Sequence, residues 1–129
     1  MLSKSRPPST RILVAENDPA VLHLLASIVK EEGFSVVSTE DGRAAYRQLV
    51  SDSDFAAVVL DMTMPHLRGL DIMRYMRTEK RLMRIPVVMI SGGDELRLIA
   101  ESFAAGASAF LCKPFSPDQL KTTLRMFTK

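Results

Sequence analysis

The sequence is poor in cysteine and has no tryptophan. Its single cysteine, Cys112, excludes an internal disulfide bond, and we expect the protein to be cytoplasmic, where thiols stay reduced. No apolar run approaches the roughly 20 residues that a membrane-spanning helix needs, so no membrane partner is expected. The opening stretch, MLSKSRPPST, lacks the apolar core of a signal peptide, and residues 1–10 are predicted to form a disordered lead.

An excess of one charge is also absent. The chain has 17 Lys and Arg against 15 Asp and Glu, a net charge of +2. This balance gives little attraction for nucleic acid, so no direct nucleic-acid partner is expected. Of the 129 residues, 47% are hydrophobic, which is enough for one domain with its own core. We assign that domain to residues 11–129.

Five short apolar runs alternate with five segments of helical character. The predicted strands are 11–15, 34–39, 55–61, 85–91 and 108–112, and the predicted helices are 19–33, 41–50, 69–80, 94–107 and 116–127. Strands that are apolar on both faces and joined by helices predict a parallel sheet covered on both sides. We therefore predict an α/β fold, a doubly wound (βα)5 three-layer sandwich of the flavodoxin-like type, with strand order 2-1-3-4-5.

Polar residues follow four of these strands at the point where each ends. Glu16 and Asn17 come after the first strand, Asp61 ends the third, Ser91 ends the fourth and Lys113 follows the fifth. The carboxyl ends of parallel strands share one edge of the sheet, which is where doubly wound folds bind ligands. A buried carboxylate such as Asp61 is costly unless a cation compensates it. The pattern predicts a site with acids, a hydroxyl and a lysine.

The stretches ILVAENDP, VVLDMTMPHLRGLDIMR, PVVMISG and GASAFLCKPF resemble the receiver domain of two-component response regulators. The resemblance covers nearly the whole chain, from about Arg11 to Phe127. It implies a phosphoprotein of signal transduction rather than an enzyme that turns over a substrate. Its phosphoryl donor would be a sensor histidine kinase or a phosphotransfer protein.

The resemblance also implies a role for each site residue. Asp61 would be the phosphoacceptor, forming an aspartyl phosphate. Glu16, Asn17, Asp61 and the backbone carbonyl of Met62 would bind Mg²⁺ or Mn²⁺. Lys113 would contact the phosphoryl oxygens with a fixed positive charge, because phosphoryl transfer depends on charge neutralisation and positioning.

Further residues are implied to act in switching. Ser91 would donate its hydroxyl to the phosphoryl group, and Phe110 would change rotamer with it. Thr63 and Gly93 occupy positions near the attacking water of dephosphorylation, and the peptide bond before Pro114 is expected to be cis. Output would pass to a downstream protein or an output domain through the face of the fourth helix, fifth strand and fifth helix, with a phosphorylation-linked homodimer as a further implied assembly.

The sequence departs from the family at Asn17, where a carboxylate is usual. A neutral amide oxygen removes one negative charge from the metal site, and Mg²⁺ prefers carboxylates and water. We expect weak metal binding and slow phosphorylation. The alternative function is a pseudo-receiver, an interaction module with an impaired site that never turns over phosphate.

Two other classes fit less well. A phosphatase of the haloacid-dehalogenase type also uses an aspartate at a strand end, but it needs a second aspartate at the position that Thr63 occupies. A flavodoxin would need a hydroxyl- and glycine-rich phosphate loop after the first strand, whereas ENDP is acidic.

The cations Arg74, Arg77 and Arg81 recur at helical spacing in the third helix and just beyond it. This pattern is typical of a solvated helix face. A docking patch for an acidic partner is the alternative.

Overall fold

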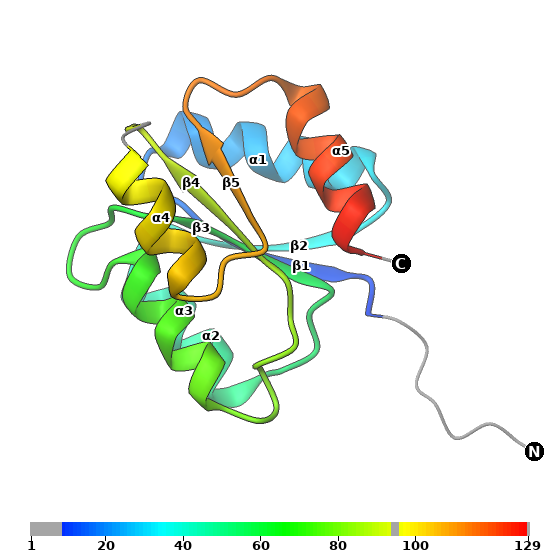
Figure 1. Ribbon diagram of the computed structural model, residues 1–129. Helices are drawn as coiled ribbons and strands as arrows, with labels where there is room; N and C mark the ends of the chain where they lie inside the picture. Colours follow the sequence, from blue (N-terminus) through cyan, green and yellow to red (C-terminus); the bar gives the residue numbers. More distant parts are fainter. Residues whose placement is uncertain (1–8, 94–95, 129) are drawn as a thin grey trace, which may run out of the picture.

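The computed structural model describes residues 9–93 and 96–128. Its elements alternate without exception, as Figure 1 shows. In chain order they are β1 (Arg11–Ala15), α1 (Pro19–Glu31), β2 (Ser35–Thr39), α2 (Gly42–Ser51), β3 (Ala57–Asp61), α3 (Gly69–Thr78), β4 (Val87–Ser91), α4 (Leu96–Ala104), β5 (Ala109–Cys112) and α5 (Pro117–Phe127).

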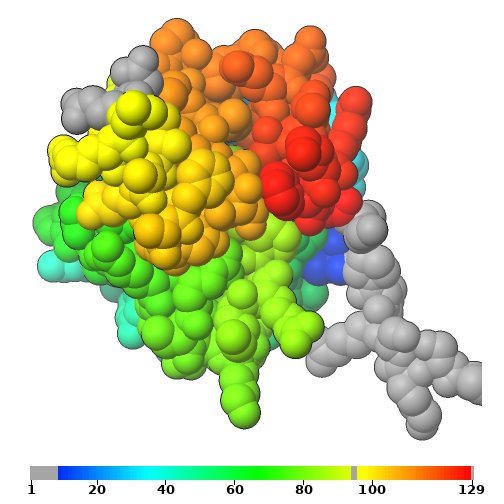
Figure 2. All heavy atoms as spheres, in the orientation of Figure 1, coloured from blue at the N-terminus to red at the C-terminus, as the bar shows by residue number. Residues whose placement is uncertain are grey.

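The five strands form one parallel sheet in the order β2-β1-β3-β4-β5, which confirms the predicted fold. Every residue of β3 and β4 is buried, because helices cover both faces of these central strands. One core half packs α1 and α5 against the sheet, and the other packs α2 and α3 against the opposite face. In Figure 2, α4 (yellow to orange) lies between α3 (green) and the chain of β5 and α5 (orange to red).

Capping residues fix the starts of two helices. Asp18 accepts hydrogen bonds from the backbone N–H groups of Ala20 and Val21, with Pro19 in the first turn of α1. Ser116 and Gln119 form a reciprocal capping box at the start of α5. These caps set where the loops at the carboxyl edge of the sheet turn into helices.

Helix α3 is shorter than predicted, ending at Thr78 rather than Lys80. Glu79 leaves the helical conformation, with φ of −106° and ψ of 121°, and its N–H donates to the Met76 carbonyl. In the turn that follows, the guanidinium of Arg77 donates hydrogen bonds to the carbonyls of Met83 and Ile85. The expectation that Arg77 belongs to a solvated helix face is therefore wrong. This side chain is partly buried and binds backbone instead of water.

The predicted disordered lead falls mostly on residues 1–8, which lie outside the described residues, as do positions 94 and 95 of the predicted fourth helix. Ser9 is anchored, since its hydroxyl donates to the Asp54 carbonyl and accepts from the N–H of Arg11. Thr10 accepts a hydrogen bond from the N–H of Ser35. No helix among the described residues combines the length and apolarity of a membrane span.

Candidate functional site

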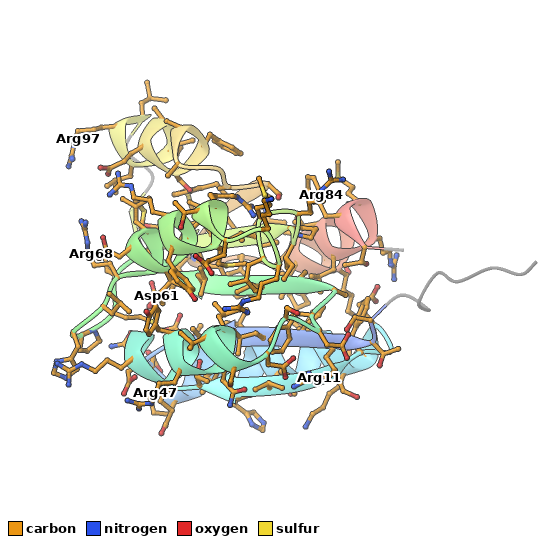
Figure 3. The ribbon with its side chains drawn as sticks, turned by 90° about the horizontal axis from the view of Figure 1, so that it is seen from below. Arg11, Arg47, Asp61, Arg68, Arg84 and Arg97 are labelled. Carbon is orange, nitrogen blue, oxygen red and sulfur yellow. The ribbon has the colours of Figure 1, made fainter. Side chains whose placement is uncertain are left out.

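The carboxyl ends of four strands bring the predicted side chains together. Asp61, the last residue of β3, is 2% exposed, and Glu16, which follows β1, is fully buried. Ser91 ends β4 and is buried, and Lys113 follows β5. Figure 3 shows Asp61 at this edge of the sheet. The convergence follows from the parallel order of the strands.

A lysine lies between two carboxylates at the centre of this edge. The Nζ atom of Lys113 is 2.8 Å from Oε1 of Glu16 and 3.4 Å from Oδ2 of Asp61. The other oxygen of each carboxylate is held by backbone: the N–H of Asp18 donates to Oε2 of Glu16, and the N–H of Thr63 donates to Oδ1 of Asp61. Each acid thus has one oxygen fixed by the chain and one oxygen turned toward the lysine.

The electrostatics of the pocket oppose a fully ionised Asp61. Burial, together with the neighbouring Glu16 carboxylate, raises the pKa of Asp61 from its ordinary value of 3.8 to about 6, although the Thr63 N–H and the Lys113 charge act the other way. Burial alone would lower the pKa of Lys113, but its contacts with both carboxylates outweigh it and raise that pKa. The lysine therefore stays charged while two acids compete for it.

Few carboxylates in the pocket are available to bind a divalent cation. Asn17 is exposed at the rim, and no group of three or more His, Cys, Asp or Glu side chains suited to a metal occurs in the part of the chain that the structure describes. Oε1 of Glu16 is buried, and its described partner is the Lys113 ammonium at 2.8 Å. Two carboxylates that share one lysine fit Mg²⁺, which usually binds one or two carboxylates and keeps several waters.

The remaining predicted residues surround this centre. The hydroxyl oxygen of Ser91 accepts a hydrogen bond from the N–H of Gly93 at 3.1 Å. Phe110 is partly buried and packs against the core half that contains α2 and α3. Thr63 and Pro114 are exposed, and the peptide bond before Pro114 is cis, as expected.

Sequence reasoning missed the glycine that opens α3. A Cβ atom at Gly69 would collide with the carbonyl oxygen of Asp61, so only glycine lets this helix start so close to the acidic strand end. Gly42 has the same role at α2, where a Cβ would collide with the Leu67 carbonyl. A glycine at the first position of two helices was the available signal. Between Asp61 and Gly69, His66 adopts a left-handed backbone with φ of 72°.

The comparisons with known sequences all point to the same family. The sequence profile of the response regulator receiver domain matches residues 12–125. The cell cycle transcriptional regulator CtrA of Caulobacter vibrioides is 31% identical over 110 residues, which cover 85% of this chain and 46% of CtrA. The chain thus spans about half the length of this relative. The chemotaxis protein CheY1 of Helicobacter pylori is 26% identical over 90% of this chain and 94% of its own.

Solved structures agree with the fold. The receiver domain of the Francisella response regulator 1452 superposes with a TM-score of 0.83 at 25% identity, covering 92% of this chain and 95% of that chain. The receiver domain of the Pseudomonas aeruginosa sensor histidine kinase PA1611, solved with magnesium coordinated in its active site cleft, has a TM-score of 0.83 at 23% identity, covering 92% and 97%.

Proposed function

The chain belongs to the response regulator receiver domain family, and from that premise we propose that Asp61 accepts a phosphoryl group from a sensor histidine kinase or a phosphotransfer protein. The observation that carries the proposal is the position of Asp61, buried at the end of β3 with Lys113 3.4 Å from its Oδ2 atom. The protein acts as a phosphoacceptor signalling domain and does not turn over a separate substrate. The protein acts in the cytoplasm, where a sensor histidine kinase or a phosphotransfer protein usually donates its phosphoryl group.

The transfer uses the oxygen of Asp61 that faces Lys113. Oδ1 accepts the Thr63 N–H, so Oδ2 is the atom available to attack the phosphorus of a phosphohistidine. A P–O bond forms, the P–N bond breaks, and the released imidazole takes its proton from solvent. Lys113 then exchanges its contact with the carboxylate for one with the phosphoryl oxygens. The acyl phosphate is an activated carboxyl group that water later hydrolyses.

The residues that would hold Mg²⁺, or Mn²⁺, are Glu16, Asp61, the carbonyl of Met62 and the amide oxygen of Asn17. When bound, the cation neutralises charge on the transferring phosphoryl group. Glu16 would supply a buried carboxylate oxygen, and Asn17 a neutral oxygen where a carboxylate would bind more tightly. We therefore expect a weak metal site and slow phosphorylation.

The response to phosphorylation begins at Ser91 and Phe110. The hydroxyl of Ser91 accepts from Gly93, which leaves its own proton free to donate to a phosphoryl oxygen. Phe110 changes rotamer with that shift, and the face of α4, β5 and α5 then binds a downstream protein, an output domain or a second copy of the chain. Thr63, Gly93 and Pro114 border the path of the water that hydrolyses the acyl phosphate.

One observation favours a second function, that of a pseudo-receiver. Lys113 contacts both Glu16 and Asp61 and offsets one of their two negative charges, and the exposed Asn17 adds no charge. A pocket whose negative charge is already reduced by a lysine has less affinity for a metal ion, so the fold would then serve as an interaction module that is not phosphorylated.

The deciding experiment is the intact mass of the protein after incubation with Mg²⁺ and acetyl phosphate. We expect the mass of one phosphoryl group to be added to the wild type and not to Asp61→Asn. Asn17→Asp restores a carboxylate and should label faster at low Mg²⁺.

Two outcomes would overturn the phosphoacceptor function. Labelling that persists in Asp61→Asn would place the modification elsewhere. No labelling of either the wild type or Asn17→Asp at high Mg²⁺ would favour the pseudo-receiver.

A further inference from the structure

One face of α2 carries exposed apolar and cationic side chains together. Tyr46 and Val50 lie about one turn apart and are 38% and 47% exposed. Arg43 and Arg47 are exposed on the same face. A surface helix normally turns its polar side outward and keeps its apolar residues in the core. An outward face that combines aromatic, aliphatic and arginine side chains has the composition typical of the centre of a protein–protein interface.

The two arginines of this face lack acidic partners. Within the described part of the chain, neither the Arg43 nor the Arg47 guanidinium has an ion pair or a hydrogen bond. Helix α2 contains no acidic residue, and Asp41, just before it, is occupied as the N-cap by accepting the N–H of Ala44 at 2.8 Å. Arg125, in contrast, makes two hydrogen bonds with the Glu32 carboxylate.

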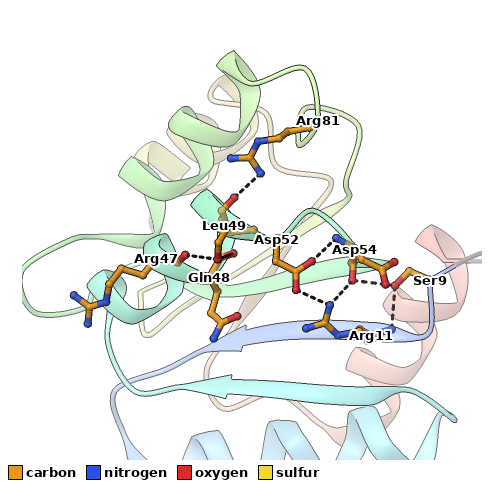
Figure 4. A network of polar contacts seen from close by, with 9 residues as sticks. Ser9, Arg11, Arg47, Gln48, Leu49, Asp52, Asp54 and Arg81 are labelled. Carbon is orange, nitrogen blue, oxygen red and sulfur yellow. Dashed lines mark hydrogen bonds and ion pairs between the residues drawn. The ribbon is translucent and has the colours of Figure 1, made fainter.

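The face continues across the seam between α2 and α3. The ring of Tyr46 meets that of Tyr75 edge-on, with centroids 4.9 Å apart. Arg81, which follows α3, donates to the hydroxyl of Tyr75 at 3.1 Å and to the carbonyl of Leu49 at 2.6 Å. Figure 4 shows Arg81 reaching Leu49 while Arg47 projects away from the neighbouring polar network. These contacts join α2 to α3 and hold the residues at the seam in place without a partner.

We call this surface the α2–α3 patch, made up of Arg43, Tyr46, Arg47, Val50 and Arg81, and we propose that it binds an acidic peptide segment of a partner protein. Guanidinium groups bind carboxylates in a bidentate fashion, more tightly than ammonium groups do. Tyrosine and arginine are also the residues that most often dominate binding energy at interfaces. The matching segment carries carboxylates on both sides of one or two apolar side chains, which pack on Tyr46 and Val50.

Two other occupants suit the patch less well. A nucleic acid backbone needs a continuous row of cations, whereas the patch has only three, beside apolar side chains, and the chain has a net charge of only +2. A second copy related by a twofold axis would bring Arg43 and Arg47 against their own counterparts, and like charges repel. A peptide segment that carries carboxylates beside apolar side chains matches both the cations and the apolar area of the patch.

The patch is separate from the face through which we propose phosphorylation to act. Helices α2, α3 and α4 lie on one side of the sheet, and α2 is the farthest of them from β5 (Figure 1). A peptide on α2 and α3 therefore leaves α4, β5 and α5 free. Binding at the patch is expected to be the same whether or not Asp61 is phosphorylated, which makes it a docking function distinct from the switch.

The test selects short random peptides displayed on phage against the full chain. We expect enriched sequences to combine Asp or Glu with aromatic or aliphatic residues. A fluorescent copy of an enriched peptide is then titrated by anisotropy. Arg47→Glu should weaken its binding roughly tenfold or more, because one cation becomes a repelling charge. Val50→Ser should weaken it less, through lost apolar contact.

The matched control is Arg84→Glu, which makes the same charge change at another exposed arginine. Figure 3 places Arg84 on the opposite side of the molecule from Arg47. Its affinity should stay within about twofold of the wild type, since Arg84 is not part of the α2–α3 patch. Asp61→Asn should also bind like the wild type, so a failure of the phosphoacceptor function leaves this test intact.

Four results would overturn the proposal. Enriched peptides without acidic residues, or binding that Arg47→Glu does not change, would remove the patch as their site. Binding of single-stranded RNA that Arg47→Glu abolishes would assign the patch to nucleic acid. A wild type that sediments as a dimer and an Arg47→Glu variant that sediments as a monomer would assign it to a second copy. Unfolding curves of each variant verify that the fold is intact.

Discussion

Lys113 and Arg77 are cations withdrawn from solvent at opposite edges of the sheet, and they are satisfied differently. Lys113, at the carboxyl edge, faces the carboxylates of Glu16 and Asp61. Arg77, at the amino edge, makes four hydrogen bonds, all to backbone carbonyls, including two to Gly106. Contacts with acids raise the pKa of Lys113, whereas burial lowers that of Arg77.

The difference separates a switchable centre from a fixed one. Carbonyl oxygens keep the same dipole under all conditions, so Arg77 ties α3 to the segment after α4 permanently. Carboxylates change charge when they are protonated, bind a cation or accept a phosphoryl group. The carboxyl edge therefore holds its charges in competition, whereas the contacts of Arg77 at the amino edge stay the same.

The largest expected effect comes from removing the fixed cation. Arg77→Met keeps the apolar stem but leaves the carbonyls of Met83, Ile85 and Gly106 without their donor. We expect the free energy of unfolding to fall by about 2 to 3 kcal/mol, because partly buried acceptors lose their hydrogen bonds. Urea unfolding monitored by circular dichroism measures this change.

Arg84→Met is the control for that loss. Arg84 is exposed and has no described partner, so its replacement should change stability by less than about 0.5 kcal/mol. Equal losses in the two variants would mean that the carbonyl contacts of Arg77 contribute nothing. Phosphoryl labelling of the folded Arg77→Met protein should match the wild type, since the site lies at the other edge.

Sequence reasoning could predict the fold and the carboxyl-edge site, because each depends on local patterns. Apolar runs and the caps at Asp18 and Ser116 locate the elements, and parallel strands then bring their polar ends together. The role of Arg77 could not be predicted in the same way. Its partners include the carbonyl of Gly106, 29 positions along the chain, and backbone oxygens carry no residue signature. Helical spacing does not distinguish it from the exposed Arg74.

At the carboxyl edge, too, the sequence predicts which residues meet but not their detailed contacts. The order of the strands predicts that Lys113 meets Glu16 and Asp61, but not which oxygen of each acid is fixed by backbone. That detail depends on the turns after β1 and β3, where the N–H groups of Asp18 and Thr63 point back at the acids. The glycine at the start of α3 was a sequence signal for a close approach, but the sequence did not show that the atom approached is the Asp61 carbonyl oxygen.

The second prediction concerns the pH dependence of stability. The native pKa of Asp61, about 6, lies above its ordinary value of 3.8, so the folded protein binds more protons than the unfolded chain between these pH values. The contribution of Asp61 to stability is therefore greatest below pH 4 and is lost as the pH rises through 6. Asp61→Asn removes this loss and should raise the free energy of unfolding by about 1 to 2 kcal/mol at pH 8 with chelator present.

Paired urea titrations at pH 4 and pH 8 measure that effect. The gain from Asp61→Asn should be larger at pH 8 than at pH 4. An equal gain at the two pH values would mean that desolvation of the charged carboxylate is not the cause.

The smallest expected effect lies in backbone strain, where the two edges also differ. At the amino edge the left-handed position before β5 is a glycine, Gly106, with φ of 113°. In the loop after β3 the left-handed residue is His66, with φ of 72°. Most residues with a Cβ atom adopt this conformation at a cost of about 1 kcal/mol. His66→Gly should therefore raise the free energy of unfolding by up to about 1 kcal/mol, less the greater freedom that glycine gains in the unfolded chain.

His66→Ala distinguishes backbone strain from an effect of the imidazole. Alanine removes the ring but keeps the Cβ atom, so it should give no gain in thermal or urea unfolding. A gain from alanine equal to that from glycine would assign the effect to the side chain. A gain from glycine alone would mean that the loop beside Asp61 retains strain that the amino edge avoids, in keeping with the tendency of functional sites to hold strained residues.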